Sequence, residues 1–135
     1  MTDLAAMLAS IDVGVRPDAY VFASVEASSP AVAAAHAVVD EREGRTVVLT
    51  EREAARLGLP AQPAFAWLTL SVHSSLEAVG LTAAFSTALG AAGISANVLA
   101  GFHHDHVLVP VRDAERAVRV LRSLRDAADQ PGGPA

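Results

Sequence analysis

The stretch FAWLTLSVHSSLEAVGLTAAFSTALGAAGISANVLAGFHHDHVLVP, from Phe65 to Pro110, decides how this chain is expected to fold. It begins with an alternation typical of a strand, continues with apolar residues at helical spacing, and then returns to strand-like alternation twice. Gly93 separates the helical part from the strands that follow it. The predicted elements are a strand over 65–73, a helix over 80–92, strands over 94–101 and 106–109, and a final helix with Asp113 as its N-cap.

The first half of the chain has a similar mixture of predicted strands and short helices. A short amphipathic helix near the N-terminus is followed by a strand over 20–25 and by a hairpin whose two strands, 36–40 and 46–49, flank a charged tip. Thr50 then has the pattern of a helix N-cap, with Glu53 three residues on as its capping-box partner. This pattern predicts a second short helix over 51–57, which ends at Gly58.

Together these elements predict an α+β fold of two ferredoxin-like βαββα modules, with antiparallel sheets packed by helices. We expect an N-terminal half over 1–60, a C-terminal domain over 64–125 and a disordered tail over 126–135. The second half lacks a fourth strand after its last helix. The two halves are therefore expected to share one sheet or to pack as intertwined lobes.

Composition excludes several classes of function. The 135 residues carry a formal net charge of −5, with only 19% charged residues, which argues against nucleic-acid binding because phosphate neutralisation needs clustered cations. There is no cysteine, which excludes disulfides, thiolate zinc sites and a cysteine nucleophile. All ten basic residues are arginine, which excludes a Schiff-base lysine.

No run of residues approaches the roughly 20 apolar residues that a membrane-spanning helix needs. The N-terminus carries Asp3 and no early basic residue, so it is a poor match to a signal peptide. We expect a cytoplasmic α+β protein with no membrane association, no cofactor and no resident metal.

The corner after the strand 65–73 has two interpretations. Ser74-Ser75-Leu76-Glu77 has the capping-box pattern, so the helix can begin at Ser75 and continue through Gly80. Alternatively, residues 74–79 form a loop and the helix begins at Gly80. In that case the backbone N–H groups near Val79 and Leu81 lie at the positive end of a helix dipole, where a carboxylate or phosphate binds well.

Two other features are candidates for a functional site. Asn97 lies in a predicted strand among apolar neighbours, where asparagine is uncommon. The run Phe102-His103-His104-Asp105-His106 fits either a polar hairpin turn or a metal site, which His73 would join if its strand were adjacent. A serine hydrolase has little support, because no G-x-S-x-G elbow is present.

The run HSSLEAVGLTAAFSTALGAAGISANVLAGFHHDHVLVP resembles ACT domains, and closely resembles small stand-alone proteins with two ACT-like modules. In the similar modules of aspartate kinases, a glycine and an apolar residue open the first helix, and a strand of the pattern Ile-x-x-Asn-Val follows it. Those positions are here Gly80-Leu81 and Ile94-Ser95-Ala96-Asn97-Val98. The resemblance therefore favours a helix that begins at Gly80.

The resemblance implies that the protein binds a small ligand, usually an amino acid, at an interface of modules or subunits. The ligand carboxylate would meet backbone N–H groups of Val79, Gly80 and Leu81, and Asn97 would hold the ammonium group. The remaining contacts expected with the ligand are Ser74, Ser75, Glu77, Phe102 and His104. The resemblance further implies a non-enzymatic protein that regulates an enzyme on another chain or acts only as a sensor. Unpaired sheet edges favour a homodimer. The alternatives are a metal-binding protein or small enzyme that uses the hairpin His103–His106, and a structural interaction module.

Overall fold

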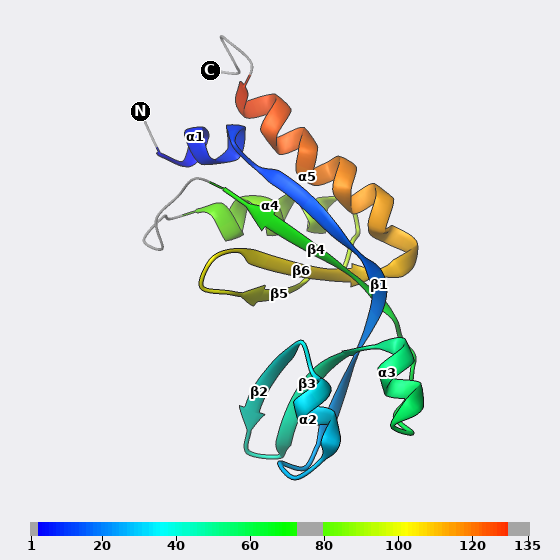
Figure 1. Ribbon diagram of the computed structural model, residues 1–135. Coiled ribbons are helices and arrows are strands. Elements are labelled where there is room, and N and C mark those ends of the chain that lie inside the picture. The colour runs from blue at the N-terminus through cyan, green and yellow to red at the C-terminus, as the bar shows by residue number, and fades with distance from the viewer. Residues whose placement is uncertain (1–2, 73–79, 130–135) are drawn as a thin grey trace. The chain divides into compact units, whose positions relative to one another are not determined.

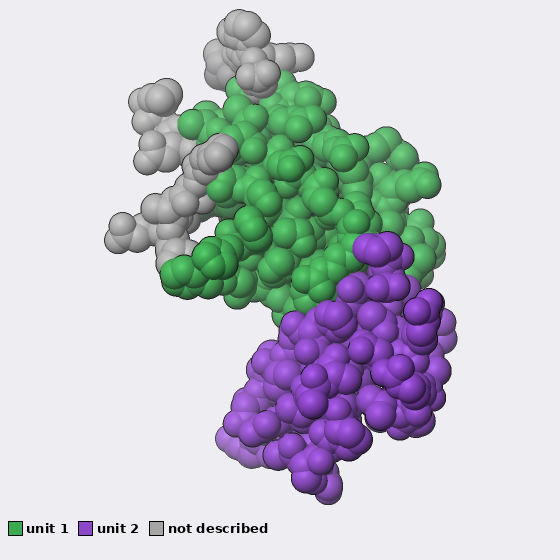
Figure 2. Space-filling view, in the orientation of Figure 1, with its two compact units in different colours: residues 1–16, 67–135 green, residues 17–66 purple. Residues whose placement is uncertain are grey.

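The computed structural model describes residues 3–72 and 80–129. The chain divides into two compact units, which Figure 2 distinguishes by colour: unit 1 is Met1–Arg16 with Trp67–Ala135, and unit 2 is Pro17–Ala66. In chain order (Figure 1) the elements are α1 (Asp3–Ala9), β1 (Asp12–Val25), α2 (Pro30–Ala34), β2 (Ala37–Glu41), β3 (Gly44–Thr50), α3 (Glu51–Arg56), β4 (Phe65–Ser71), α4 (Leu81–Ala91), β5 (Asn97–Ala100), β6 (Asp105–Pro110), the 3₁₀ turn η1 (Val111–Asp113) and α5 (Ala114–Asp129). The α+β fold with antiparallel pairing is as predicted.

Strand β1 belongs to both units. Of its fourteen residues, 12–16 belong to unit 1 and 17–25 belong to unit 2. In sheet order, unit 2 contains β2-β3-β1 and unit 1 contains β1-β4-β6-β5. The N-terminal half thus supplies the strand that the C-terminal half lacks. Residues 1–16, which we assigned to the first half, form part of unit 1.

Unit 2 has a small apolar core between its strands and its two short helices. Val21 of β1 lies opposite Leu49 of β3, and Val38 of β2 lies opposite Val47 of β3. The fully buried members of this core are Val21, Ala31, Val47, Leu49 and Ala54. Helix α3 ends as predicted at Gly58, which has a φ of +74°.

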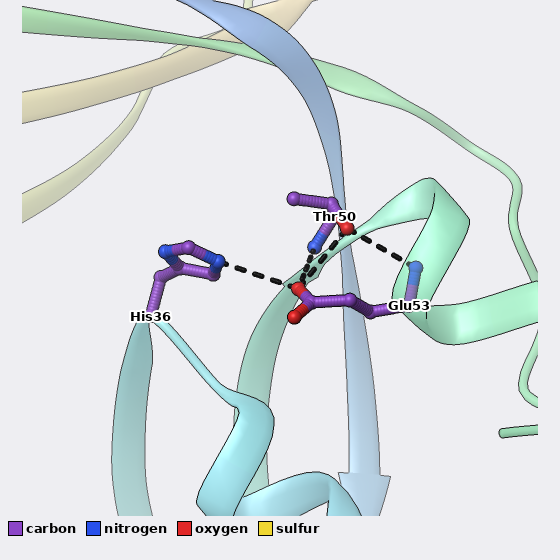
Figure 3. Close-up of polar contacts among 3 residues, drawn as sticks. All are labelled: His36, Thr50 and Glu53. Atoms are coloured by element: carbon purple, nitrogen blue, oxygen red, sulfur yellow. Dashed lines mark hydrogen bonds and ion pairs between the residues drawn. The ribbon is translucent and has the colours of Figure 1, made fainter. Parts of the chain in front are cut away.

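The capping box at the start of α3 is complete (Figure 3). Glu53 N–H donates to Thr50 Oγ1 at 3.1 Å, and Glu53 Oε1 accepts from Thr50 N–H at 3.2 Å. The same carboxylate oxygen lies 3.3 Å from His36 Nε2. Burial alone would raise the pKa of Glu53, but the bonds from Thr50 and His36 together hold that pKa below 4.5. The capping box therefore contributes stability that is present above about pH 4.5 and is lost as the pH falls further.

Replacing Thr50 with alanine is expected to lower the free energy of unfolding by about 1 kcal/mol, because the substitution removes the N-cap acceptor. Thr87→Ala is a matched control, since Thr87 is exposed within α4 and caps nothing. Urea denaturation measures both variants. Equal unfolding free energies for the two variants would show that the cap contributes no stability.

Unit 1 has the larger core, built from one face of its strands and from α1, α4 and α5. The predicted stripes are confirmed: Phe85 and Leu89 of α4 are fully buried, as is Leu121 of α5. Leu68 and Leu70 of β4 are also buried, as the alternation of the strand predicted.

The predicted start of the last helix is confirmed, since α5 begins at Ala114, although the turn η1 (Val111–Asp113) leads into it and Asp113 belongs to that turn. Two other predicted boundaries are wrong. Helix α5 continues to Asp129, so residues 126–129 are helical, while residues 130–135 lie outside the described part of the chain. The strand predicted over 94–101 is shorter and begins at Asn97.

Ile94 belongs to the end of α4 and not to a strand. Gly93 has a φ of +74°, Gly93 N–H donates to Gly90 O at 2.9 Å, and Ile94 N–H donates to Leu89 O at 2.9 Å. These two bonds form a Schellman motif, in which the residue after the glycine packs its apolar side chain against the helix. Ile94 is accordingly only 3% exposed.

Candidate functional site

The candidate site lies at the end of unit 1 where β4 finishes and α4 begins. Figure 1 shows the start of α4 and the loop between β5 and β6 toward the same end of the unit. Ser71 Oγ, at the end of β4, lies 3.3 Å from His104 Nδ1 at the end of this loop. We refer to residues 101–104 as the hairpin loop.

Gly80 is the N-cap of α4, with a φ of +95° and a ψ of −11°. Its carbonyl oxygen accepts from Ala84 N–H at 2.9 Å, which starts the helix as one of the two interpretations predicted. Because glycine has no side chain, the N-cap residue itself supplies no side-chain acceptor to the first turn. Leu81, the next residue, is 7% exposed, so its side chain belongs to the core and only its backbone is suited to a ligand.

One neighbour lies close to Gly80 within the unit. A Cβ atom at this position would lie 3.2 Å from Leu4 Cδ2 of α1. On this side of Gly80, the space that a side chain would need is occupied by Leu4 of α1. Gly80 is required here both for its left-handed backbone and for this packing.

The hairpin loop presents its side chains to solvent. Phe102 is 77% exposed, and its ring makes an edge contact with His103, with ring centroids 5.0 Å apart. Gly101 N–H donates to His104 O at 2.9 Å, which closes the loop. Of the ligand-binding residues predicted from the sequence, Phe102 and His104 thus lie in the loop that contacts the last residue of β4, Ser71.

Asn97 is placed elsewhere. It is exposed at the start of β5, opposite Leu108, and its amide Nδ2 donates to Leu108 O at 3.4 Å. The hairpin loop begins beyond the other end of β5, roughly 10 Å away along the strand. The structure therefore does not bring Asn97 together with His104. Four other predicted residues, Ser74, Ser75, Glu77 and Val79, lie outside the described residues.

A polar cluster that the sequence reasoning missed joins β4 to β6. His106 Nδ1 lies 3.1 Å from Trp67 Nε1 and 3.0 Å from Thr69 Oγ1. The guanidinium carbon of Arg16, on β1, is 3.8 Å from the centre of the Trp67 ring, a cation–π distance. Trp67, Thr69 and Ser71 alternate along β4 and therefore share one face of the strand. Nothing in the sequence showed that β6 is the neighbouring strand.

The histidines of this end do not form a metal site in the described chain. Within residues 3–72 and 80–129, no three histidine, aspartate or glutamate side chains are arranged to hold a metal ion. His73, considered as a further ligand, lies outside those residues. Nor does any described helix have the length and apolar character needed to cross a membrane.

Unit 2 contains a separate surface cavity of about 330 Å³. Ala19, Ala55 and Ala61 form its apolar lining, and Asp18 and Arg52 contribute opposite charges. Several of these residues lie near the start of α3, and none of them is a residue that the sequence singled out for ligand binding.

Comparison with known proteins identifies the family. Residues 1–66 and residues 65–123 each match an ACT domain. A protein of unknown function from Vibrio cholerae, described as a possible transport protein, is 41% identical, with a TM-score of 0.82, over 90% of this chain and 95% of that one.

More distant structures share the fold. A protein from Agrobacterium tumefaciens is 20% identical over 86% of this chain and 90% of that chain, with a TM-score of 0.61. The regulatory subunit of aspartate kinase from Thermus flavus is 13% identical over 85% of this chain and 96% of its own, with a TM-score of 0.60. No curated protein matches the chain. With an ACT domain matched in each half and a 41% identical relative along nearly its whole length, the chain belongs to the ACT-domain family.

Proposed function

We propose that this protein is a regulatory sensor that binds an amino acid at the end of unit 1 where α4 begins. ACT domains are generally ligand-binding regulatory modules and not catalytic ones. The observation that carries the proposal is Gly80, a left-handed glycine that opens an eleven-residue helix and supplies no side-chain cap of its own. Backbone N–H groups in this first turn suit an α-carboxylate.

The position of Asn97 supports a site made by two copies of the chain. Helix α4 is about 16 Å long, and Asn97 follows its far end, whereas Gly80 is at its near end. The α-carboxylate and α-ammonium groups of one amino acid are far closer together than this. If Asn97 holds the ammonium group, it therefore comes from a second copy of the chain.

Strand β5, which carries Asn97, suits this arrangement. It is the last strand in the sheet order of unit 1, and both Asn97 and Ala100 are exposed. An edge strand with free backbone groups is a ready partner for a second chain. We therefore propose a homodimer in which the edge of β5 faces the α4 end of the partner. The regulated enzyme would be another chain, and the location cytoplasmic.

A thermal-shift screen of the twenty common amino acids, with and without a chelator, tests this function. One amino acid is expected to raise the melting temperature, because at 100-fold excess over Kd it adds about 2.7 kcal/mol to the free energy of unfolding. Asn97→Ala is expected to abolish the shift, while Ser95→Ala, a change at an exposed neighbour, retains it. A flat response to all twenty, with a lower melting temperature in chelator, would contradict the proposal and favour a metal-binding protein.

A further inference from the structure

The hydrogen bond between Trp67 and His106 fixes the protonation state of His106. Trp67 Nε1–H is only a donor, so His106 Nδ1, 3.1 Å away, must accept. The Thr69 hydroxyl lies 3.0 Å from the same nitrogen. His106 is therefore neutral, with its single proton on Nε2, because a proton on Nδ1 would point at the indole N–H.

The charged and titratable groups around His106 come from β1, from β6 and from the hairpin loop. Arg16 of β1 stacks on Trp67, His104 lies with its ring centroid 6.4 Å from that of His106, and Asp105 is adjacent in β6. Burial, then Arg16 and His104, lower the pKa of His106 below 6.5, and Asp105 partly opposes them. The surroundings thus favour the neutral ring that the bond to Trp67 requires.

The ring of His106 and the hairpin loop are interlocked. A Cβ atom at Gly101 would lie 2.9 Å from His104 O and 3.1 Å from His106 Nε2, so only glycine allows the loop to close against this ring. Two residues before His106, the His104 ring contacts Ser71 of β4. The bonds from His106 to Trp67 and from His104 to Ser71 are therefore successive links from β4 to the loop.

We propose that His106 is a positioning residue that holds the hairpin loop against β4 through Trp67, and that protonation of its Nδ1 releases the loop and weakens ligand binding at this end. The release itself follows from the geometry of unit 1. Its effect on a ligand rests on the proposed function.

The single tryptophan makes the loss of its bond to His106 directly measurable. In ¹⁵N-labelled protein, the one indole N–H resonance is expected to shift in a single titration that lies below about pH 6.5. His106→Gln is expected to remove this titration, because an amide oxygen accepts from Trp67 but does not bind a proton in this range. The matched control His103→Gln, at the exposed tip of the loop, is expected to retain it.

The melting temperature gives a second readout. Because the pKa of His106 is lower in the folded chain than in the unfolded one, its contribution to stability is complete above about pH 6.5 and is lost as the pH falls toward the folded value. His106→Gln is expected to lack this part of the pH dependence.

Several results would overturn the proposal, and they separate its two parts. An indole resonance that is constant from about pH 8 to about pH 5, or that titrates unchanged in His106→Gln, overturns the role of His106. If His106→Gln fails to fold, the ring ¹⁵N shifts of the unaltered protein decide, since a proton on Nδ1 at neutral pH also overturns it.

The second part uses the pool of twenty amino acids as the probe. If the pool raises the melting temperature less at a pH below the titration of His106 than at a pH above it, protonation of His106 is coupled to ligand binding. Equal shifts at both pH values overturn the coupling alone. No shift at any pH, together with a normal indole titration, refutes the proposed function while the release by protonation stands.

Discussion

Replacing Phe85 with alanine is expected to lower the free energy of unfolding by about 3–5 kcal/mol. Phe85 is fully buried near the centre of α4 and is among the largest fully buried side chains of the described chain. The substitution removes this apolar surface from the core and leaves a cavity that the surrounding side chains fill only in part. Since small proteins are stable by about 5–15 kcal/mol, this loss is a large fraction of the total.

The matched control is Phe102→Ala, which removes the same side chain from the hairpin loop. Phe102 is 77% exposed, so the change is expected to alter the free energy of unfolding by less than about 0.5 kcal/mol. Guanidinium denaturation measures both variants. A cost at Phe85 no greater than that at Phe102 would mean that α4 does not pack as the structure describes.

Gly80→Ala is expected to abolish amino-acid binding and to lower the free energy of unfolding by about 1–2 kcal/mol. The loss of stability follows from the left-handed backbone, with a φ of +95°, that alanine adopts only under strain. The new Cβ atom would also lie 3.2 Å from Leu4 Cδ2 and displace α1 locally. Binding is lost because the first-turn N–H groups of α4 no longer point where the ligand carboxylate lies.

Gly93→Ala separates the effect on binding from the effect on stability. Gly93 lies just beyond the other end of α4 and also has a positive φ, of +74°. A Cβ atom there would meet no atom within 4 Å apart from its neighbours along the chain. It is expected to cost a similar free energy of unfolding and to leave ligand affinity unchanged. Calorimetric titration with the amino acid found in the screen measures the ligand affinity of both variants. If Gly80→Ala binds as well as Gly93→Ala, the site is not at the start of α4.

Local signals predicted most of the elements. The capping box of Thr50 and Glu53, the glycine stop at Gly93 and the apolar stripe through Phe85 each depend on residues within one or two turns. Such signals are present in the sequence because the interactions themselves are local.

Strand β1 was predicted only in part, and its role was not. We expected a strand from Tyr20, whereas β1 begins at Asp12 and includes Gly14 and Pro17. These two residues usually interrupt strands, and nothing nearby in the sequence compensates for them. The strand continues because it has partners in both units, and such pairing is decided by residues far away in the chain.

The difference between local signals and long-range pairing also explains which parts of the candidate site could be predicted from the sequence. The glycine cap at Gly80 could be predicted from the residues around it, but the separation of Asn97 from the hairpin loop depends on the path of α4 and β5. The bond between Trp67 and His106 joins residues 39 positions apart. It depends on β4 and β6 being neighbours, which no local pattern reveals.

Mapping the bound amino acid by ¹⁵N-edited NMR tests the central claim most directly. The titration uses the amino acid that stabilises the protein and follows every backbone N–H resonance. We predict that the largest shifts occur at Gly80, Leu81 and Thr82, with smaller ones at His104 and Asn97. Shifts confined to the cavity of unit 2, around Asp18 and Arg52, would contradict the account and place the ligand in the other unit.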